Sequence, residues 1–118
     1  MPINNPFVEY LLELLQPAPG VTAKRMFGGY GVFRDGLMFG LVADEVLYLK
    51  VDDQNRDDFV ARGLEPFIYV KDGKPMAMSY HQAPGEALDN ADGMIAWAEK
   101  AYQAALRAKQ PKAKKRTK

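Results

Sequence analysis

The stretch KRMFGGYGVFRDGLMFGLVADEVLYLKVDD, residues 24–53, decides the fold of this chain. Its apolar and aromatic runs are separated by a glycine-rich turn, by Asp35-Gly36 and by Asp44-Glu45. An Asp-Gly pair between apolar runs is typical of a two-residue type I′ loop, in which both central residues have positive φ. The stretch therefore predicts a meander of antiparallel strands.

The two loops also predict which residues face each other across the strands. The expected pairs are Arg34–Leu37, Phe33–Met38, Val32–Phe39, Gly31–Gly40, Val42–Leu47, Leu41–Tyr48, Gly40–Leu49 and Met38–Val51. Because side chains alternate between the faces of a sheet, one face becomes wholly apolar. It holds Phe33, Met38, Val42, Leu47, Leu49 and Val51. This face is predicted to be the core.

The opposite face mixes aromatic and aliphatic side chains with two basic ones. It holds Tyr30, Val32, Arg34, Leu37, Phe39, Leu41, Tyr48 and Lys50. Surfaces of this composition mark contacts with a partner or a second subunit. Alternatively, another segment of the same chain, such as the last helix, covers the face, and the sequence leaves both readings open. On the first reading the expected interaction residues are Tyr30, Val32, Arg34, Phe39, Tyr48 and Lys50.

Helices are expected on both sides of the strands. Asn5 and Pro6 suit the cap and first position of a helix that ends before Pro17, and residues 52–63 form a short one. A third hairpin turns at Asp72-Gly73 and should pair Tyr69 with Met76 and Phe67 with Met78. A long helix starts at Asn90 or Asp92. The predicted fold class is α+β: an antiparallel meander of about six strands with N-terminal and C-terminal helices packed on it.

Composition limits the class of protein. A length of 118 residues suits one domain, expected over residues 1–109, and no apolar run approaches the roughly 18 residues of a membrane span. The chain has no cysteine, which fits a reducing cytoplasm, the expected location. Residues 110–118, QPKAKKRTK, carry five basic side chains and no acidic one. This basic tail is predicted to be disordered, because it has almost nothing apolar to bury.

The sequence contains few residues that could carry out catalysis. Ser79 and His81, the only serine and histidine, lie two residues apart on a strand, but no nucleophile turn surrounds them. A single histidine and scattered carboxylates do not make a metal site. Gly28, Gly29 and Gly31 lead into a strand, whereas a phosphate loop leads into a helix. The sequence therefore predicts no catalytic, cofactor-binding or metal-binding residues.

Three short stretches point to a family. Arg25-Met26-Phe27-Gly28-Gly29-Tyr30-Gly31, with the Phe33-Arg34-Asp35-Gly36 hairpin and Leu47-Tyr48-Leu49-Lys50-Val51, resembles the N-terminal domain of the TfoX (Sxy) competence regulators. The resemblance covers roughly residues 5–105 and implies an α+β domain without catalytic residues. TfoX regulators carry a second, C-terminal domain, so the expectation is a stand-alone version of the first.

Two functions follow from these observations. The first is a non-enzymatic, regulatory interaction module that acts through protein–protein contacts, with a homodimer as one form of that contact. The alternative is weak binding of nucleic acid through the basic tail and the sheet aromatics, with bases stacking on exposed rings. The acidic balance of residues 1–109 opposes the alternative.

Overall fold

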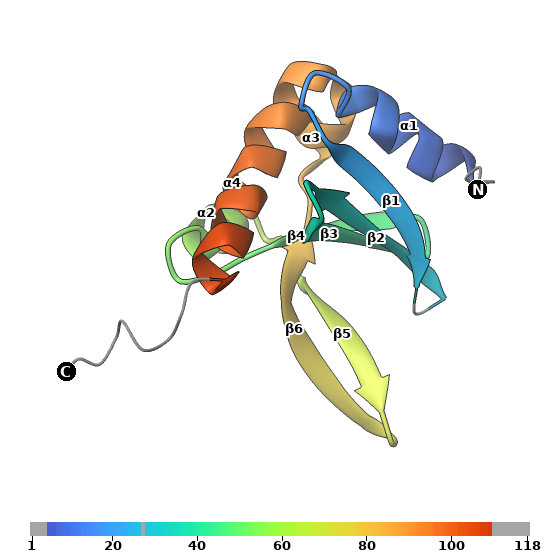
Figure 1. Cartoon of the computed structure of the whole chain (residues 1–118). Helices are drawn as coiled ribbons and strands as arrows, with labels where there is room; N and C mark the ends of the chain where they lie inside the picture. Colours follow the sequence, from blue (N-terminus) through green and yellow to red (C-terminus); the bar gives the residue numbers. More distant parts are fainter. Residues whose placement is uncertain (1–4, 27, 110–118) are drawn as a thin grey trace.

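A computed structural model describes residues 5–26 and 28–109 and confirms the α+β fold (Figure 1). Its elements, in chain order, are α1 (Pro6–Leu14), β1 (Val21–Met26), β2 (Gly29–Arg34), β3 (Leu37–Ala43), β4 (Val46–Lys50), α2 (Arg56–Val60), β5 (Pro66–Lys71), β6 (Lys74–Gln82), α3 (Gly85–Asp89) and α4 (Ala91–Lys109). In this part of the chain the strands form one antiparallel sheet of six, in the order β1-β2-β3-β4-β6-β5. The basic tail lies outside the described residues.

The three predicted hairpin turns are confirmed. Each loop has positive φ at both central residues: 51° and 81° at Asp35-Gly36, 52° and 60° at Asp44-Glu45, and 54° and 76° at Asp72-Gly73. These angles are those of type I′ turns, whose twist matches that of the strands they join. Turn chemistry thus accounts for the connections β2-β3, β3-β4 and β5-β6.

The helix ends follow the capping residues, with two differences from expectation. The Asn5 side chain accepts hydrogen bonds from the backbone N–H groups of Phe7 and Val8 and caps α1, as predicted. Asn90 caps α4 through the N–H of Gly93. The short helix α2 spans only five residues, and the five-residue α3 was not predicted. Across residues 5–26 and 28–109, every helix falls short of the length or the apolarity that crossing a bilayer requires.

A bulge in β3 corrects the predicted register. The pairs Arg34–Leu37 and Phe33–Met38 form as expected, but the register then shifts, and Val32 faces Gly40 rather than Phe39. Phe39 is therefore the extra residue of the bulge, and Gly31 faces Leu41 rather than Gly40. A bulge reverses which side chains of a strand point to a given face. The two faces predicted for β2 and for the start of β3 were consequently wrong.

The core lies between the sheet and the helices, which cover one face of it (Figure 1). Val32 and Phe39 belong to this core, with exposed fractions of 1% and 2%, although they were predicted on the opposite face. The same core includes residues of β4, of α1 with its C-cap, and of α4, namely Leu47, Leu49, Leu11, Leu15, Trp97 and Ala101. Phe33 and Met38, predicted to be core residues, are only half-buried and lie on the other face. The β3-β4 register is as predicted, so Leu47 and Leu49 point to the core.

Candidate protein-binding surface

The sheet face turned away from the helices carries an apolar trough. It has a volume of about 440 Å³, and its lining includes the large apolar side chains of Met26, Met38, Leu41, Phe67, Met78 and Tyr80. They come from β1, β3, β5 and β6, so the trough extends across the sheet from one edge strand to the other. Tyr48 of β4 borders it, with its ring 5.1 Å from that of Phe67 in an edge-to-face arrangement. A trough with few polar groups suits apolar side chains of another molecule better than a charged ligand.

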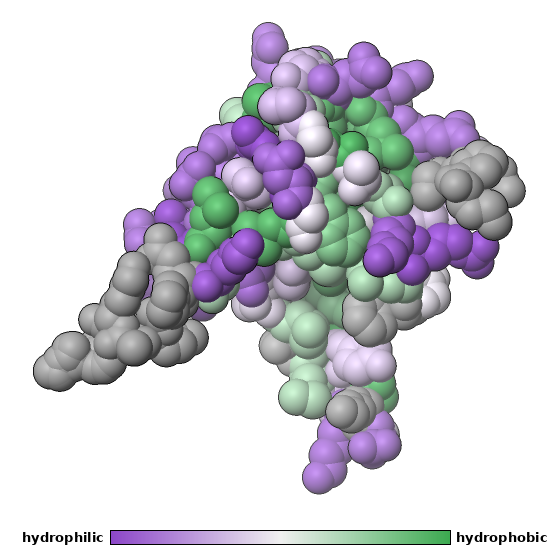
Figure 2. Space-filling view, in the orientation of Figure 1, coloured by the Kyte–Doolittle hydropathy of each residue, from purple (hydrophilic) through white to green (hydrophobic). Residues whose placement is uncertain are grey.

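The β5-β6 hairpin continues this surface beyond the body of the domain (Figure 1). In Figure 2 apolar residues extend along the projecting hairpin, and hydrophilic ones gather at its tip. Seven large apolar side chains of the described residues are exposed, and five of them belong to this hairpin. They are Ile68, Tyr69, Val70, Met76 and Met78. Such a concentration on one element marks a contact surface, because isolated exposed apolar residues are usually scattered.

One basic side chain lies on this face among aromatic ones. The ammonium of Lys50 donates to the hydroxyl of Ser79 at 2.9 Å and lies 5.2 Å from the ring centre of Tyr80. Burial lowers the pKa of Lys50, partly offset by the carboxylate of Asp52, and burial also raises the pKa of Tyr80. Lys50 thus provides a partly desolvated positive charge beside the apolar trough.

The six predicted interaction residues do not share one face, and that expectation was wrong. Tyr48 and Lys50 lie on the trough side, as the β3-β4 register requires. Tyr30 packs against the core and also lines one end of the trough. Val32 and Phe39 are core residues.

Arg34 completes the set, and it meets α4. Its guanidinium binds Glu99 at 2.9 Å and lies 4.4 Å from the ring centre of Tyr102. The Phe39 ring meets the same tyrosine edge-on, with 6.3 Å between the ring centres. For this part of the sheet the alternative reading holds: the last helix covers it. Tyr30, Phe39, Tyr48, Arg34 and Lys50 therefore do not form a single aromatic platform for nucleic-acid bases.

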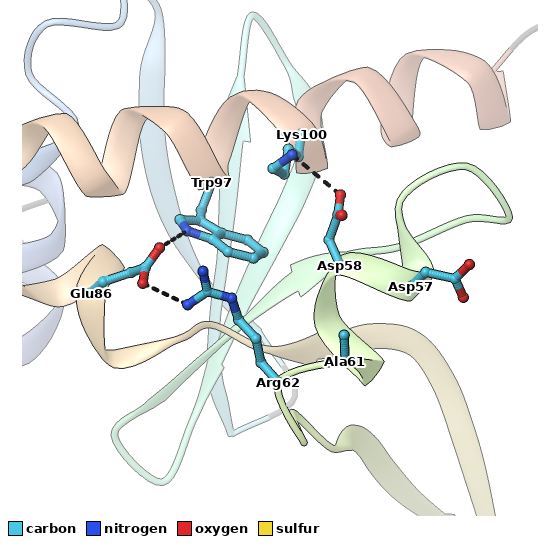
Figure 3. A pocket seen from close by; sticks show the side chains of 7 residues that line it. All are labelled: Asp57, Asp58, Ala61, Arg62, Glu86, Trp97 and Lys100. Carbon is cyan, nitrogen blue, oxygen red and sulfur yellow. Dashed lines mark hydrogen bonds and ion pairs between the residues drawn. The ribbon is translucent and has the colours of Figure 1, made fainter.

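A second cluster of polar side chains surrounds Trp97 (Figure 3). The indole Nε1 donates to Glu86 at 2.8 Å, and Arg62 and Lys100 lie 5.1 Å and 5.7 Å from the ring centre. Arg62 also binds Glu86 at 2.5 Å, and Lys100 binds Asp58 at 3.2 Å. The indole hydrogen bond, with help from Arg62, lowers the pKa of Glu86.

This Trp97 cluster explains how three helices hold together. Asp58 and Arg62 come from α2 and the turn after it, Glu86 from α3, and Trp97 and Lys100 from α4. The shallow hollow beside them measures about 390 Å³. Of the five charged residues that line it, four form two ion pairs, Arg62 with Glu86 and Lys100 with Asp58. The cluster was missed in the sequence because its members are up to 42 residues apart. We interpret it as structural.

Catalytic and metal chemistry find little support in the described residues. Lys50 binds the Ser79 hydroxyl, and Nδ1 of the buried His81 is 2.8 Å from the carbonyl oxygen of Leu64. The serine and the histidine that were considered as a pair therefore each have another hydrogen-bond partner. Within residues 5–26 and 28–109, no three His, Asp or Glu side chains are arranged to hold a metal ion.

Comparison with known families identifies the domain. The family model of the TfoX N-terminal domain matches residues 13–105, which include every strand of the sheet and both hairpins of the meander. A search of curated proteins gave no match. The family is one of non-enzymatic, competence-related regulatory modules. On the strength of this match and of the α+β fold, the chain belongs to the TfoX N-terminal domain family.

Proposed function

We propose that this protein is a non-enzymatic regulator of the cytoplasm that acts by binding another protein through the apolar trough. One observation carries the proposal: the helix-free face of the sheet exposes a 440 Å³ hollow of Met, Leu, Phe and Tyr side chains. Methionine and aromatic side chains adapt to apolar partner surfaces and supply most of the binding energy at such contacts. Membership of a family of competence-related regulators makes a component of transcription control the kind of partner to expect.

The charge beside the trough indicates which polar group a partner should carry. Lys50 offers a positive charge at the trough, and Tyr48 offers a hydroxyl on the same face, adjacent along the ladder. A partner segment with apolar side chains and one carboxylate satisfies both features. Of the residues expected from the sequence to make the contact, Tyr30, Tyr48 and Lys50 are retained in this proposal.

The test is complementation in the native cell. The gene is deleted and replaced by the wild type, by Met38→Glu or by Val60→Glu, and transcripts are compared by RNA sequencing. Met38 lines the trough, whereas Val60 is an exposed apolar residue of α2 and serves as the matched control. The wild type and Val60→Glu should restore the same transcripts, and Met38→Glu should not, at equal abundance and with a similar melting temperature. Full restoration by Met38→Glu would contradict the proposal that the trough binds the partner.

A further inference from the structure

The two edge strands of the sheet differ in the side chains that they expose. Strands β1 and β5 stand at the ends of the strand order. The β1 edge exposes Lys24 and Arg25, and charges of this kind discourage pairing with another strand. The β5 edge carries Phe67-Ile68-Tyr69-Val70, an uninterrupted run of strand-forming apolar residues. Among the described residues no strand lies beyond β5, so this edge is a template for strand addition.

The hairpin is also apolar on both of its faces. Side chains alternate along β5, so Ile68 and Val70 share one face and Tyr69 lies on the other, beside Met76. Ile68 and Val70 are 47% and 62% exposed, because the hairpin projects past the helices that cover the rest of that face (Figure 1). Occupying the trough would leave these two side chains in water. A second contact at the hairpin itself is required to bury them.

The hairpin turn determines which backbone groups point to the free edge. A two-residue loop makes its flanking residues a hydrogen-bonded pair, here Lys71 and Lys74, and the pattern alternates from there. Val70–Pro75 is then a non-hydrogen-bonded pair, which suits a proline that has no N–H. Ile68–Ala77 is the next such pair. The N–H and C=O groups of Ile68 and Val70 therefore point away from β6, toward the free edge.

We propose that a second copy of this chain pairs with β5 in antiparallel orientation, so that two six-stranded sheets join across a two-fold axis. Ile68 of each copy pairs with Val70 of the other, which uses the four outward-facing residues of the two edges. Tyr69 lies on the axis as a non-hydrogen-bonded pair. Charge supports self-pairing: exposed Glu65 precedes β5, and residues 71–74 at its other end, Lys-Asp-Gly-Lys, sum to one positive charge, so antiparallel copies bring opposite charges together. This contact is made by the β5 edge, and it adjoins the trough, because Tyr69 also lines that hollow. Ile68 and Val70 do not line it.

Disulfide trapping tests the register, because the chain has no cysteine of its own. In the proposed dimer the two copies of residue 69 have Cα atoms about 4.5 Å apart, within the range that a disulfide bridges. The two copies of residue 70 are offset by two positions along the strands, about 8 Å apart, which is too far. Tyr69→Cys should therefore form a reducible dimer on mild oxidation, and Val70→Cys should form several-fold less. Equal yields from both variants, or none from Tyr69→Cys, would overturn the register.

Sedimentation equilibrium tests the association itself. The wild type should show a monomer–dimer equilibrium, and Val70→Pro should be monomeric, because proline removes a donor that faces the free edge and leaves the β5-β6 ladder intact. Val70→Thr keeps the donor and should still dimerise. A monomeric wild type at high concentration, or a dimer that persists in Val70→Pro, would overturn the proposal. Met38→Glu should dimerise normally yet fail to restore transcripts. Sedimentation therefore tests the dimer, and complementation tests the proposed function of the trough independently of it.

Discussion

Replacing Phe39 by alanine should be far more costly than replacing its neighbour Met38. Phe39 is 2% exposed, lies at the bulge of β3 and meets the ring of Tyr102 on α4. Removing a buried phenylalanine side chain costs about 3–5 kcal/mol, which includes the cavity that remains. Met38 lines the open trough and is only half-buried, so its truncation should cost about 1 kcal/mol.

Urea denaturation followed by circular dichroism measures both variants. With a slope of about 1.5 kcal/mol per M, a loss of about 4 kcal/mol moves the midpoint down by about 2–3 M. The Met38→Ala midpoint should move by less than about 1 M. An uninterrupted register would bury Met38 and expose Phe39, and it therefore predicts the opposite order. A larger loss for Met38→Ala than for Phe39→Ala would refute the bulge and the assignment of the two faces.

Three further predictions concern stability. Asn5→Ala removes the cap of α1 and should lower the free energy of unfolding by about 1 kcal/mol, measured by urea denaturation. Gly29→Ala would place a Cβ 2.0 Å from the backbone oxygen of Val42, so thermal melting should show a loss of about 1–3 kcal/mol; an unchanged melting temperature would contradict this close approach. The hydrogen bond from Arg107 lowers the pKa of Asp52 below its ordinary 3.8, so the pair stabilises the fold fully above that pH and progressively less as the pH falls toward the lowered value. Arg107→Met should therefore cost about 1 kcal/mol at pH 7 and less at pH 3, and an equal cost at both pH values would contradict the coupling.

The local parts of the fold were predictable from sequence because their causes are local. Asp35-Gly36 and Asp72-Gly73 determine type I′ turns through the backbone angles that Gly and Asp tolerate. Asn5 caps a helix within three residues of itself. These elements established the antiparallel sheet and the helix positions without any knowledge of tertiary contacts.

The face assignments failed because one residue of bulge reverses the alternation beyond it. Phe39 is as apolar as Met38, so hydrophobic pattern alone does not show which of them faces the core. Its position is stabilised by Tyr102, 63 residues later in the chain, and such a contact has no local signal. Gly40, next to the bulge, was the one hint, since glycine in a strand often accompanies a bulge or a close approach of the backbone.

For two residues of the candidate surface, the face of the sheet was predicted correctly, because the bulge does not affect their strand. Tyr48 and Lys50 lie beyond the bulge on β4, where the β3-β4 register holds, and they were placed on the correct face. The exposed hairpin was predicted as a hairpin but not as a projecting arm. Its position depends on how far the helices reach across the sheet, and neither the turn at Asp72-Gly73 nor the alternation of β5 contains that information.

Photocrosslinking in living cells tests the central claim, that the trough binds another protein, most directly. A photoreactive phenylalanine analogue replaces Met38 in one strain and Val60 in another, and the adducts are separated after brief illumination. We expect a discrete adduct with a different protein from position 38, and none from position 60, which lies outside the trough. An adduct from position 60 with none from position 38 would contradict the claim that this face of the sheet is the binding surface.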